Sequence, residues 1–223
     1  MIQERQMSET YRIGVILAMV GGYLDAYTYL CRGRVFANAQ TGNIVLLGIN
    51  LAEGQWRTAS YYLLPILAFV AGIFVAEGIR SRRGRGEALH WRQIVVAVQL
   101  AALLGAAFLP AGKWDPLVNI IVSFVCSMQV ETFRKVNGIT CATTMCTGNL
   151  RSGTELLFRF RRSGDMQARK DALQYYGIIL FFIVGAAAGT LINGMAGERS
   201  VLVCCAALLL VFLLMHRWKR DGV

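Results

Sequence analysis

Two polar segments decide the fold: VFANAQTGNIVLLGINLA at residues 35–52 and TCATTMCTGNLRSGTELLF at residues 140–158. They share the tripeptide Thr-Gly-Asn, which occurs at Thr41-Gly42-Asn43 and again at Thr147-Gly148-Asn149. Each segment carries polar side chains that face lipid only at a high free-energy cost. Such a segment either crosses the membrane inside a helical bundle or enters and leaves on the same side, as a re-entrant segment.

An internal duplication relates the two segments. The tripeptides lie 106 residues apart, and at the same offset Asp25 corresponds to Glu131, so an acid precedes each tripeptide by 16 residues. The order of elements also matches: an acid-bearing apolar run, a short basic link, the polar segment and two further apolar runs. This pattern predicts one integral membrane domain over residues 1–223, with repeats at about 12–111 and 116–217.

The composition excludes a soluble protein. Of the 223 residues, 56% are hydrophobic and only 16% are charged, and the mean hydropathy is +0.49. A soluble globular domain carries about 25% charged residues, which it needs to cover its surface. We therefore expect an all-α, polytopic membrane protein. Six apolar runs approach the ~20 residues that a bilayer requires: 13–31, 60–79, 93–110, 116–133, 173–193 and 200–216.

The basic residues predict the topology. The net charge of +10 would suggest nucleic-acid binding in a soluble protein, but here the basic residues flank apolar runs and set membrane orientation. If both polar segments cross the membrane, the basic residues divide 12 against 10 and show no bias. If both are re-entrant, the side with the termini holds 17 and the other side holds five: Arg32, Arg34, Arg57, Lys113 and Arg199.

The second division favours six transmembrane helices plus two re-entrant or broken polar segments, with both termini cytoplasmic. Three spans in each half place the second repeat upside down relative to the first. The sequence therefore predicts a 3+3 inverted repeat, a plan in which the working site lies near the midplane between the halves.

These motifs resemble those of the YoaK-like family of bacterial membrane proteins, a domain of unknown function. The resemblance extends from about residue 11 to 216 and rests on these matches: Gly21-Gly22-Tyr23-Leu24-Asp25-Ala26, Arg34-Val35-Phe36, Gln40-Thr41-Gly42-Asn43, Ser127-Met128-Gln129, Arg134-Lys135, Thr143-Thr144 and Thr147-Gly148-Asn149. The chain departs from the family pattern at Gln40, at Val130-Glu131 and at Asn149. The resemblance implies a multi-pass protein of the bacterial inner membrane, suspected of transport, and implies no substrate or cofactor.

The two tripeptides are the candidate substrate site: Thr41, Gly42, Asn43, Thr147, Gly148 and Asn149. Glycine between short polar residues suits a break between half-helices, whose free backbone amides favour an anionic or polar ligand. Alternatively, each tripeptide is a tight turn that packs the halves together and contacts no ligand. Arg151 either binds an anionic substrate or pairs with Glu155, one helical turn away.

Asp25 and Glu131 are the candidates for proton or ion coupling, because an ionisable group within a span marks a pathway or a relay by default. The alternative for Asp25 is a structural acid neutralised by Arg32 or Arg34. The alternative for Glu131 is an ion pair with Arg134 or Lys135, which follow within one helical turn. Separately, the small-residue pattern at Gly185 and Gly189 predicts close helix packing.

The leading functional hypothesis is a transporter of a small solute, with proton coupling as one option. A passive channel and a non-transporting scaffold or sensor are the alternatives. We expect no enzyme activity, catalytic residue, metal, cofactor or nucleic-acid partner, because no catalytic set, ligand cluster or phosphate-binding loop is recognisable. The expected partners are membrane lipid and an unknown solute, and a homo-oligomer stays open.

Overall fold

The protein is described by a computed structural model that covers residues 7–82 and 90–221 and is almost entirely helical. Its α-helices are α1 (Tyr11–Cys31), α2 (Gln40–Ala52), α3 (Trp56–Arg82), α4 (Trp91–Ala107), α5 (Asp115–Thr132), α6 (Cys146–Ser163), α7 (Met166–Ala196) and α8 (Leu202–Asp221). Short 3-10 helices are η1 (Met7–Glu9) and η2 (Gly197–Val201). Strands β1 (Lys135–Val136) and β2 (Ile139–Thr140) pair antiparallel.

A helix lies at each of the six predicted apolar spans: α1, α3, α4, α5, α7 and α8. Local signals fix several helix starts. His90 and Gln93 form a capping box at α4, Pro116 occupies the first turn of α5, and Asp165 caps α7. Three stretches are long and apolar enough to cross a bilayer: Tyr11–Cys31, Trp56–Arg82 and Met166–His216, the last containing two helices. The chain is therefore an all-α membrane protein.

The structure shifts some predicted bounds. The span predicted to end at residue 110 ends with α4 at Ala107, and the last helix begins at Leu202 instead of residue 200. Each polar segment consists of a non-helical approach followed by a single helix, and α6 continues to Ser163. The tripeptides therefore stand at helix starts and not between two half-helices.

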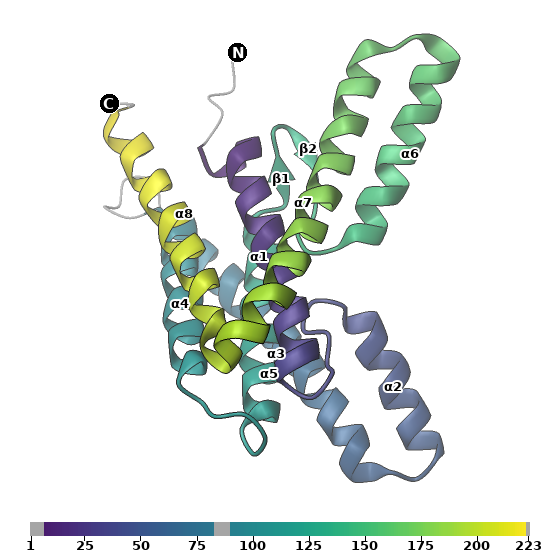
Figure 1. The fold of residues 1–223 in the computed structure, drawn as a ribbon. Helices are drawn as coiled ribbons and strands as arrows, with labels where there is room; N and C mark the ends of the chain where they lie inside the picture. Colours follow the sequence, from purple (N-terminus) through teal and green to yellow (C-terminus); the bar gives the residue numbers. More distant parts are fainter. Residues whose placement is uncertain (1–6, 83–89, 222–223) are drawn as a thin grey trace.

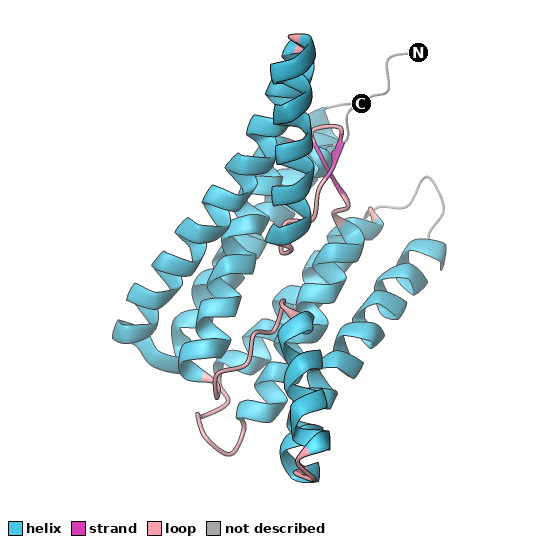
Figure 2. Cartoon of the chain, turned by 90° about the vertical axis from the view of Figure 1, so that its right-hand side faces the viewer, coloured by secondary structure: helices cyan, strands magenta, loops and turns pink. Residues whose placement is uncertain are grey.

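The approaches to α2 and α6 both end near the middle of the bundle (Figures 1 and 2). In Figure 1, α1 runs downward from the upper part of the molecule to its lower part, and the chain then returns to the middle before α2 begins. α2 runs back to the lower end beside α3, whereas α6 runs from the middle to the upper end beside α7. The two helical hairpins thus extend in opposite directions.

Close helix packing joins the first half of the chain to the second. α1 packs along α7, and α3 packs along α5. A Cβ atom at Gly185 would collide with the backbone of Met19, and one at Gly189 would lie 3.1 Å from the carbonyl oxygen of Tyr23. The prediction that Gly185 and Gly189 mark close packing is confirmed.

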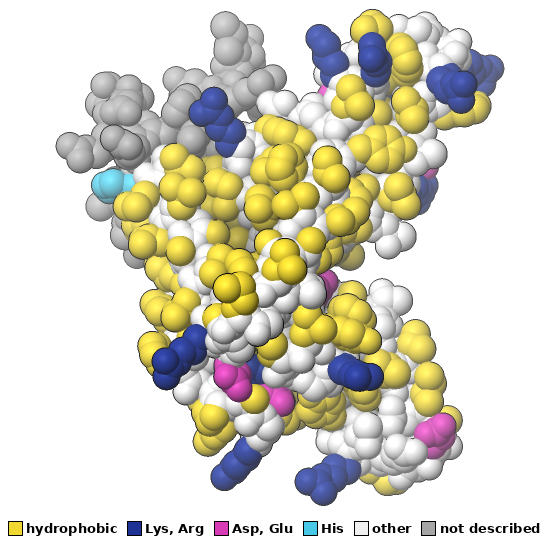
Figure 3. Space-filling view, in the orientation of Figure 1, with side chains coloured by type: hydrophobic (Ala, Val, Ile, Leu, Met, Phe, Trp, Pro, Cys, Tyr) yellow, Lys and Arg dark blue, Asp and Glu magenta, His cyan; other side chains and the backbone are white. Residues whose placement is uncertain are grey.

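The surface has the charge distribution of a membrane protein. On the face drawn in Figure 3, hydrophobic side chains cover the middle and basic side chains lie toward the two ends. The same face is hollowed between the α2–α3 hairpin and the α6–α7 hairpin (Figure 3). Some residues used to predict the topology lie outside the described positions: Arg5, Arg83 and Arg85, together with the side chains of Arg217, Lys219 and Arg220.

Candidate functional site

Asn43 and Asn149, the last residues of the two tripeptides, make equivalent hydrogen bonds. The side-chain amide of Asn43 donates to the carbonyl oxygen of Phe36 at 3.1 Å, and that of Asn149 donates to the carbonyl oxygen of Ala142 at 2.6 Å. Both acceptors precede their asparagine by seven residues, so all four positions keep the offset of the sequence repeat. Each asparagine therefore fastens the approaching loop to the first turn of its helix.

The Thr-Gly pairs of the tripeptides lie on the side of these helix starts that faces away from the packed bundle. Thr41, Thr147 and Gly148 are exposed, and Gly42 is half-buried. Apart from the neighbouring residues and the backbone of the same helix, no atom lies within 4 Å of the position that a Cβ would take at Gly42 or Gly148. Packing does not explain these two glycines, since a larger residue would fit at either place.

One turn of α1 receives both loops. Asn38, in the loop before α2, donates its side-chain amide to the carbonyl oxygen of Gly21 at 2.9 Å. From the other loop, the Thr144 methyl group would lie 3.0 Å from a Cβ at Gly21 and the carbonyl oxygen of Thr143 would lie 3.4 Å from it. Any side chain at Gly21 would press against the second loop, so this glycine permits the convergence.

Helix α5 holds the same two loops from another side. The Gln129 side-chain amide donates to the Thr143 hydroxyl at 2.9 Å and to the carbonyl oxygen of Leu17, in α1, at 3.0 Å. The Ser123 hydroxyl donates to the carbonyl oxygen of Ala37, in the first loop, at 3.2 Å. The loops therefore sit between α1 and α5, the first helices of the two predicted repeats.

Asp25 lies one helical turn after Gly21 and is only 8% exposed. It accepts a hydrogen bond at 2.9 Å from the backbone N–H of Asn38. No described lysine or arginine forms an ion pair with it. The alternative in which Arg32 neutralises Asp25 is wrong, because the Arg32 guanidinium is directed to Asp115 at 3.2 Å.

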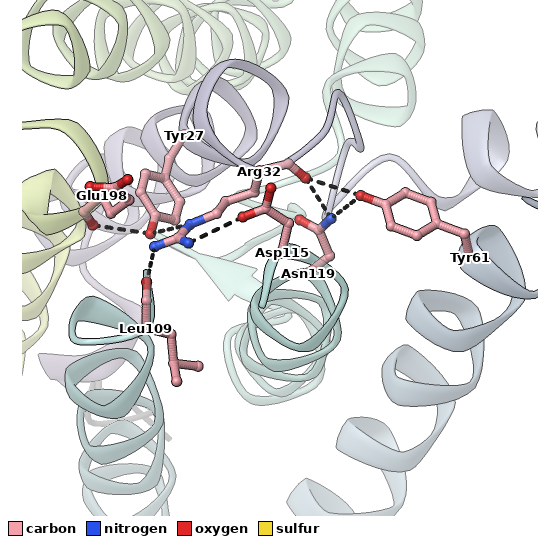
Figure 4. Close-up of polar contacts among 7 residues, drawn as sticks. All are labelled: Tyr27, Arg32, Tyr61, Leu109, Asp115, Asn119 and Glu198. Atoms are coloured by element: carbon pink, nitrogen blue, oxygen red, sulfur yellow. Dashed lines mark hydrogen bonds and ion pairs between the residues drawn. The ribbon is translucent and has the colours of Figure 1, made fainter. Parts of the chain in front are cut away.

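Arg32 is fully buried at the lower end of the bundle, where it joins several elements (Figure 4). Its guanidinium donates to the Tyr27 hydroxyl at 2.9 Å and to the carbonyl oxygen of Leu109 at 2.8 Å, in addition to Asp115. Its carbonyl oxygen accepts hydrogen bonds from Asn119 at 2.7 Å and from Tyr61 at 3.2 Å. This network closes the end of the bundle at which α1 stops.

Glu131 lies at the opposite end and has a different environment. It forms an ion pair with Arg134, whose guanidinium also lies 3.6 Å from Glu77. The hydrogen bond to Glu131 raises the pKa of Arg134, so the guanidinium stays charged. The predicted pairing of Glu131 with Arg134 is confirmed. Both residues line a cavity of about 270 Å³ together with Glu9, Arg80, Trp91, Arg92, Thr132 and Lys135.

Arg151 projects from α6 and is 80% exposed. Its guanidinium forms an ion pair with Glu155 at 2.9 Å, so the predicted pairing within the helix is present. The role of Arg151 in binding an anionic substrate stays a prediction.

The sequence did not identify several residues that shape this region: Asn38, Ser123, Gln129, Thr143, Thr144 and Arg32 as the centre of a network. Thr143-Thr144 and Gln129 belong to the motifs that carry the family resemblance, which was the available signal for those three. Ser123–Ala37 and Arg32–Asp115 are separated by more than 80 residues, and no local pattern pairs them. Asn38 lies 13 and 17 residues from its partners Asp25 and Gly21, across a loop whose path the sequence does not predict.

Comparison with known proteins supports a membrane protein. A family model described as "Protein of unknown function (DUF1275)" matches residues 13–214. The chain is also similar to the UPF0700 transmembrane protein YoaK of Bacillus subtilis (strain 168), with 27% identity over 178 residues. That match covers 75% of this chain and 77% of the relative. No solved structure matches the chain.

Proposed function

The chain belongs to the DUF1275 family, whose function is unknown, and from that premise we propose that it transports a small solute across the bacterial inner membrane. One observation carries the proposal: two polar loops, approaching from opposite ends of the bundle, converge on the turn of α1 that contains Gly21 and Asp25. Irregular backbone at membrane depth is tolerated where protein or a hydrated cavity satisfies it, and transporters use such places to bind substrates and ions.

The helix packing supports a 3+3 inverted repeat. The pairing of α1 with α7 becomes the pairing of α5 with α3 when the halves are exchanged, and α2 with α3 becomes α6 with α7. The contact between α4 and α8 is unchanged by this exchange, because each helix takes the place of the other. The matching hydrogen bonds of Asn43 and Asn149 follow the same rule.

The proposed topology has six spans and two re-entrant segments, each of which is a loop followed by α2 or α6. The paths in Figure 1 support it, because α1, α3 and α4 alternate in direction, as do α5, α7 and α8, while α2 and α6 begin in the middle. Both termini are cytoplasmic in this proposal, since their side holds 17 basic residues against five on the other side. The α2–α3 turn then faces the exterior and the α6–α7 turn faces the cytoplasm.

The proposed substrate site lies between the two Thr-Gly pairs, where the positive dipole ends of two helix starts favour a polar or anionic group. Asn43 and Asn149 position these helix starts, and Asp25 takes up the coupling ion beside them. The Arg32 network holds the outer end of the bundle closed, so outward opening has to separate Arg32 from Asp115. Glu131, in the cavity at the inner end, is the second candidate carrier.

Electrophysiology on proteoliposomes tests the proposal. Purified protein on a solid-supported membrane is exposed in turn to amino acids, sugars and small organic acids, under imposed proton and sodium gradients. We expect a saturating current with at least one class of solute. This current should be absent in Asp25→Asn and retained in Asp171→Asn, which alters an acid near the N-terminus of α7. Currents that grow linearly with solute concentration would instead indicate a channel, and the absence of both current and uptake of radiolabelled solute with every class would contradict transport.

A further inference from the structure

Asp25 is a buried acid that lacks a cationic neighbour. Its carboxylate accepts a backbone hydrogen bond from Asn38, and no described basic side chain pairs with it. Burying an uncompensated charge is strongly unfavourable, even after the surroundings relax. The carboxylate therefore requires either a proton or a bound cation.

Two buried oxygen atoms near the same turn of α1 also lack partners. The Asn38 side-chain oxygen and the Thr144 hydroxyl have no hydrogen bond within the described structure, although these residues are only 4% and 6% exposed. The Asn38 amide nitrogen is already directed to the carbonyl oxygen of Gly21, which fixes the free atom as the oxygen. The described structure has several other unpartnered buried side-chain atoms, and what distinguishes these two is that both residues contact the turn of α1 that carries the uncompensated Asp25, where one ligand could engage them together.

The two atoms come from different halves of the protein. Asn38 contacts the Gly21–Asp25 turn from the first loop, through hydrogen bonds of 2.9 Å to both ends of that turn. Thr144 contacts Gly21 from the second loop, together with the carbonyl oxygen of Thr143. Carboxylate, amide, hydroxyl and carbonyl oxygens thus gather around one helical turn.

We propose that these oxygens form a binding site for a monovalent metal cation of the sodium type, bridging the two halves at Asp25, Asn38 and Thr144. Hard cations prefer oxygen ligands, and unwound backbone at membrane depth supplies such ligands in secondary transporters. The role of this cation as the coupling ion rests on the proposed function, whereas its binding does not.

Charge and hydrogen bonding distinguish the ligands. One carboxylate compensates one positive charge, so a divalent cation would leave the site with an excess of positive charge. A proton on Asp25 would neutralise the carboxylate but would satisfy at most one of the two unpaired oxygens. A sodium-type cation satisfies the acid and both oxygens together.

Equilibrium binding of radioactive sodium to the purified, detergent-solubilised chain tests the inference, with choline replacing sodium at constant ionic strength. We expect saturable binding that is lost in Asp25→Asn and weakened roughly ten-fold in Thr144→Val, as for other removed metal-site contacts. Thr144→Val keeps the shape of the side chain and removes an unpaired hydroxyl, so we expect it to fold even if Asp25→Asn does not. Asp171→Asn is the matched acid control and is expected to bind normally.

The outcomes separate this inference from the proposed function. Sodium binding without any solute current or uptake would support the cation site and contradict the proposed transport function. Solute currents driven by a proton gradient, without saturable sodium binding, would overturn the cation site and leave the transporter intact. Equal binding by Thr144→Val and the unaltered chain would also overturn the site, because the second half would then contribute no ligand.

Discussion

The first polar loop, residues 32–39, and the second, residues 133–145, keep one interaction in common and differ in almost every other. Both are fastened by an asparagine that donates to a carbonyl seven residues earlier. The first loop starts at the buried Arg32 and contacts the acid of its own repeat, whereas the second starts with a strand pair and leaves Glu131 to Arg134. The two loops therefore share a framework, whereas their acids have different chemical surroundings.

The first prediction contrasts the two acids and has the largest expected effect. Asp25→Asn should lower solute-driven current in proteoliposomes to the level of empty vesicles, because Asp25 binds the first loop on the turn of α1 whose Gly21 contacts the second loop. Glu131→Gln should lower the current much less, since this acid is equally buried but already has a basic partner in Arg134. Equal losses in the two variants would show that the acids act as an equivalent pair.

The second prediction contrasts the two arginines. Arg32→Met removes a fully buried guanidinium and leaves the Asp115 carboxylate without its ion-pair partner. We expect the free energy of unfolding to fall by about 3 kcal/mol. Arg134→Met removes a guanidinium that is 58% exposed, so water can replace it beside the buried Glu131, and the loss should be smaller, about 1 kcal/mol. Unfolding in mixed micelles with increasing SDS measures both values. A reversed order would mean that the network in Figure 4 does not hold the bundle together.

The third prediction concerns the interaction that the loops share. Asn43→Ala and Asn149→Ala should each lower the free energy of unfolding by roughly 1–2 kcal/mol, because each leaves a carbonyl without its partner. The two losses should be alike, and the same SDS titration compares them. A loss confined to one variant would argue that the hydrogen bonds are not equivalent in the two halves.

The fourth prediction has the smallest effect on stability. Gly42→Ala and Gly148→Ala should leave the unfolding free energy unchanged or raise it slightly, because the added methyl group meets no atom and alanine favours a helix. If the Thr-Gly pairs bind substrate, the same variants should raise the solute concentration that gives half-maximal current. Unchanged currents in both would remove these glycines from the substrate site.

The sequence identified what depends on local composition. Apolar runs located the six helices now seen as α1, α3, α4, α5, α7 and α8, and helical spacing identified the pairs Arg151–Glu155 and Glu131–Arg134. The strand pair was missed although Asn137-Gly138 is a typical hairpin turn, with φ of 50° and 89°. This dipeptide is therefore a local signal for the hairpin, in addition to the basic charge of the link.

The polar contacts between distant segments could not be predicted. Arg32 was interpreted as a loop charge, because nothing near it in the sequence indicates Asp115, Leu109 or Tyr61 as partners. The convergence of Asn38 and Thr144 on Gly21 likewise depends on how the halves pack. For the tripeptides, the sequence located the right segments but not the separate roles of their residues. The asparagine holds the loop by a hydrogen bond, whereas the Thr-Gly pair is not packed against other elements.

The central claim is that the two polar segments, each a loop followed by α2 or α6, enter the membrane from opposite sides. Labelling the turns that follow α2 and α6 tests it most directly. In a chain whose native cysteines are replaced, Gln55→Cys and Ser163→Cys place one thiol on each exposed turn. A membrane-impermeant maleimide applied to intact spheroplasts should label position 55 alone, and applied to inside-out vesicles it should label position 163 alone. Labelling of both positions from the same side would contradict the inverted arrangement and would indicate that both polar segments cross the membrane.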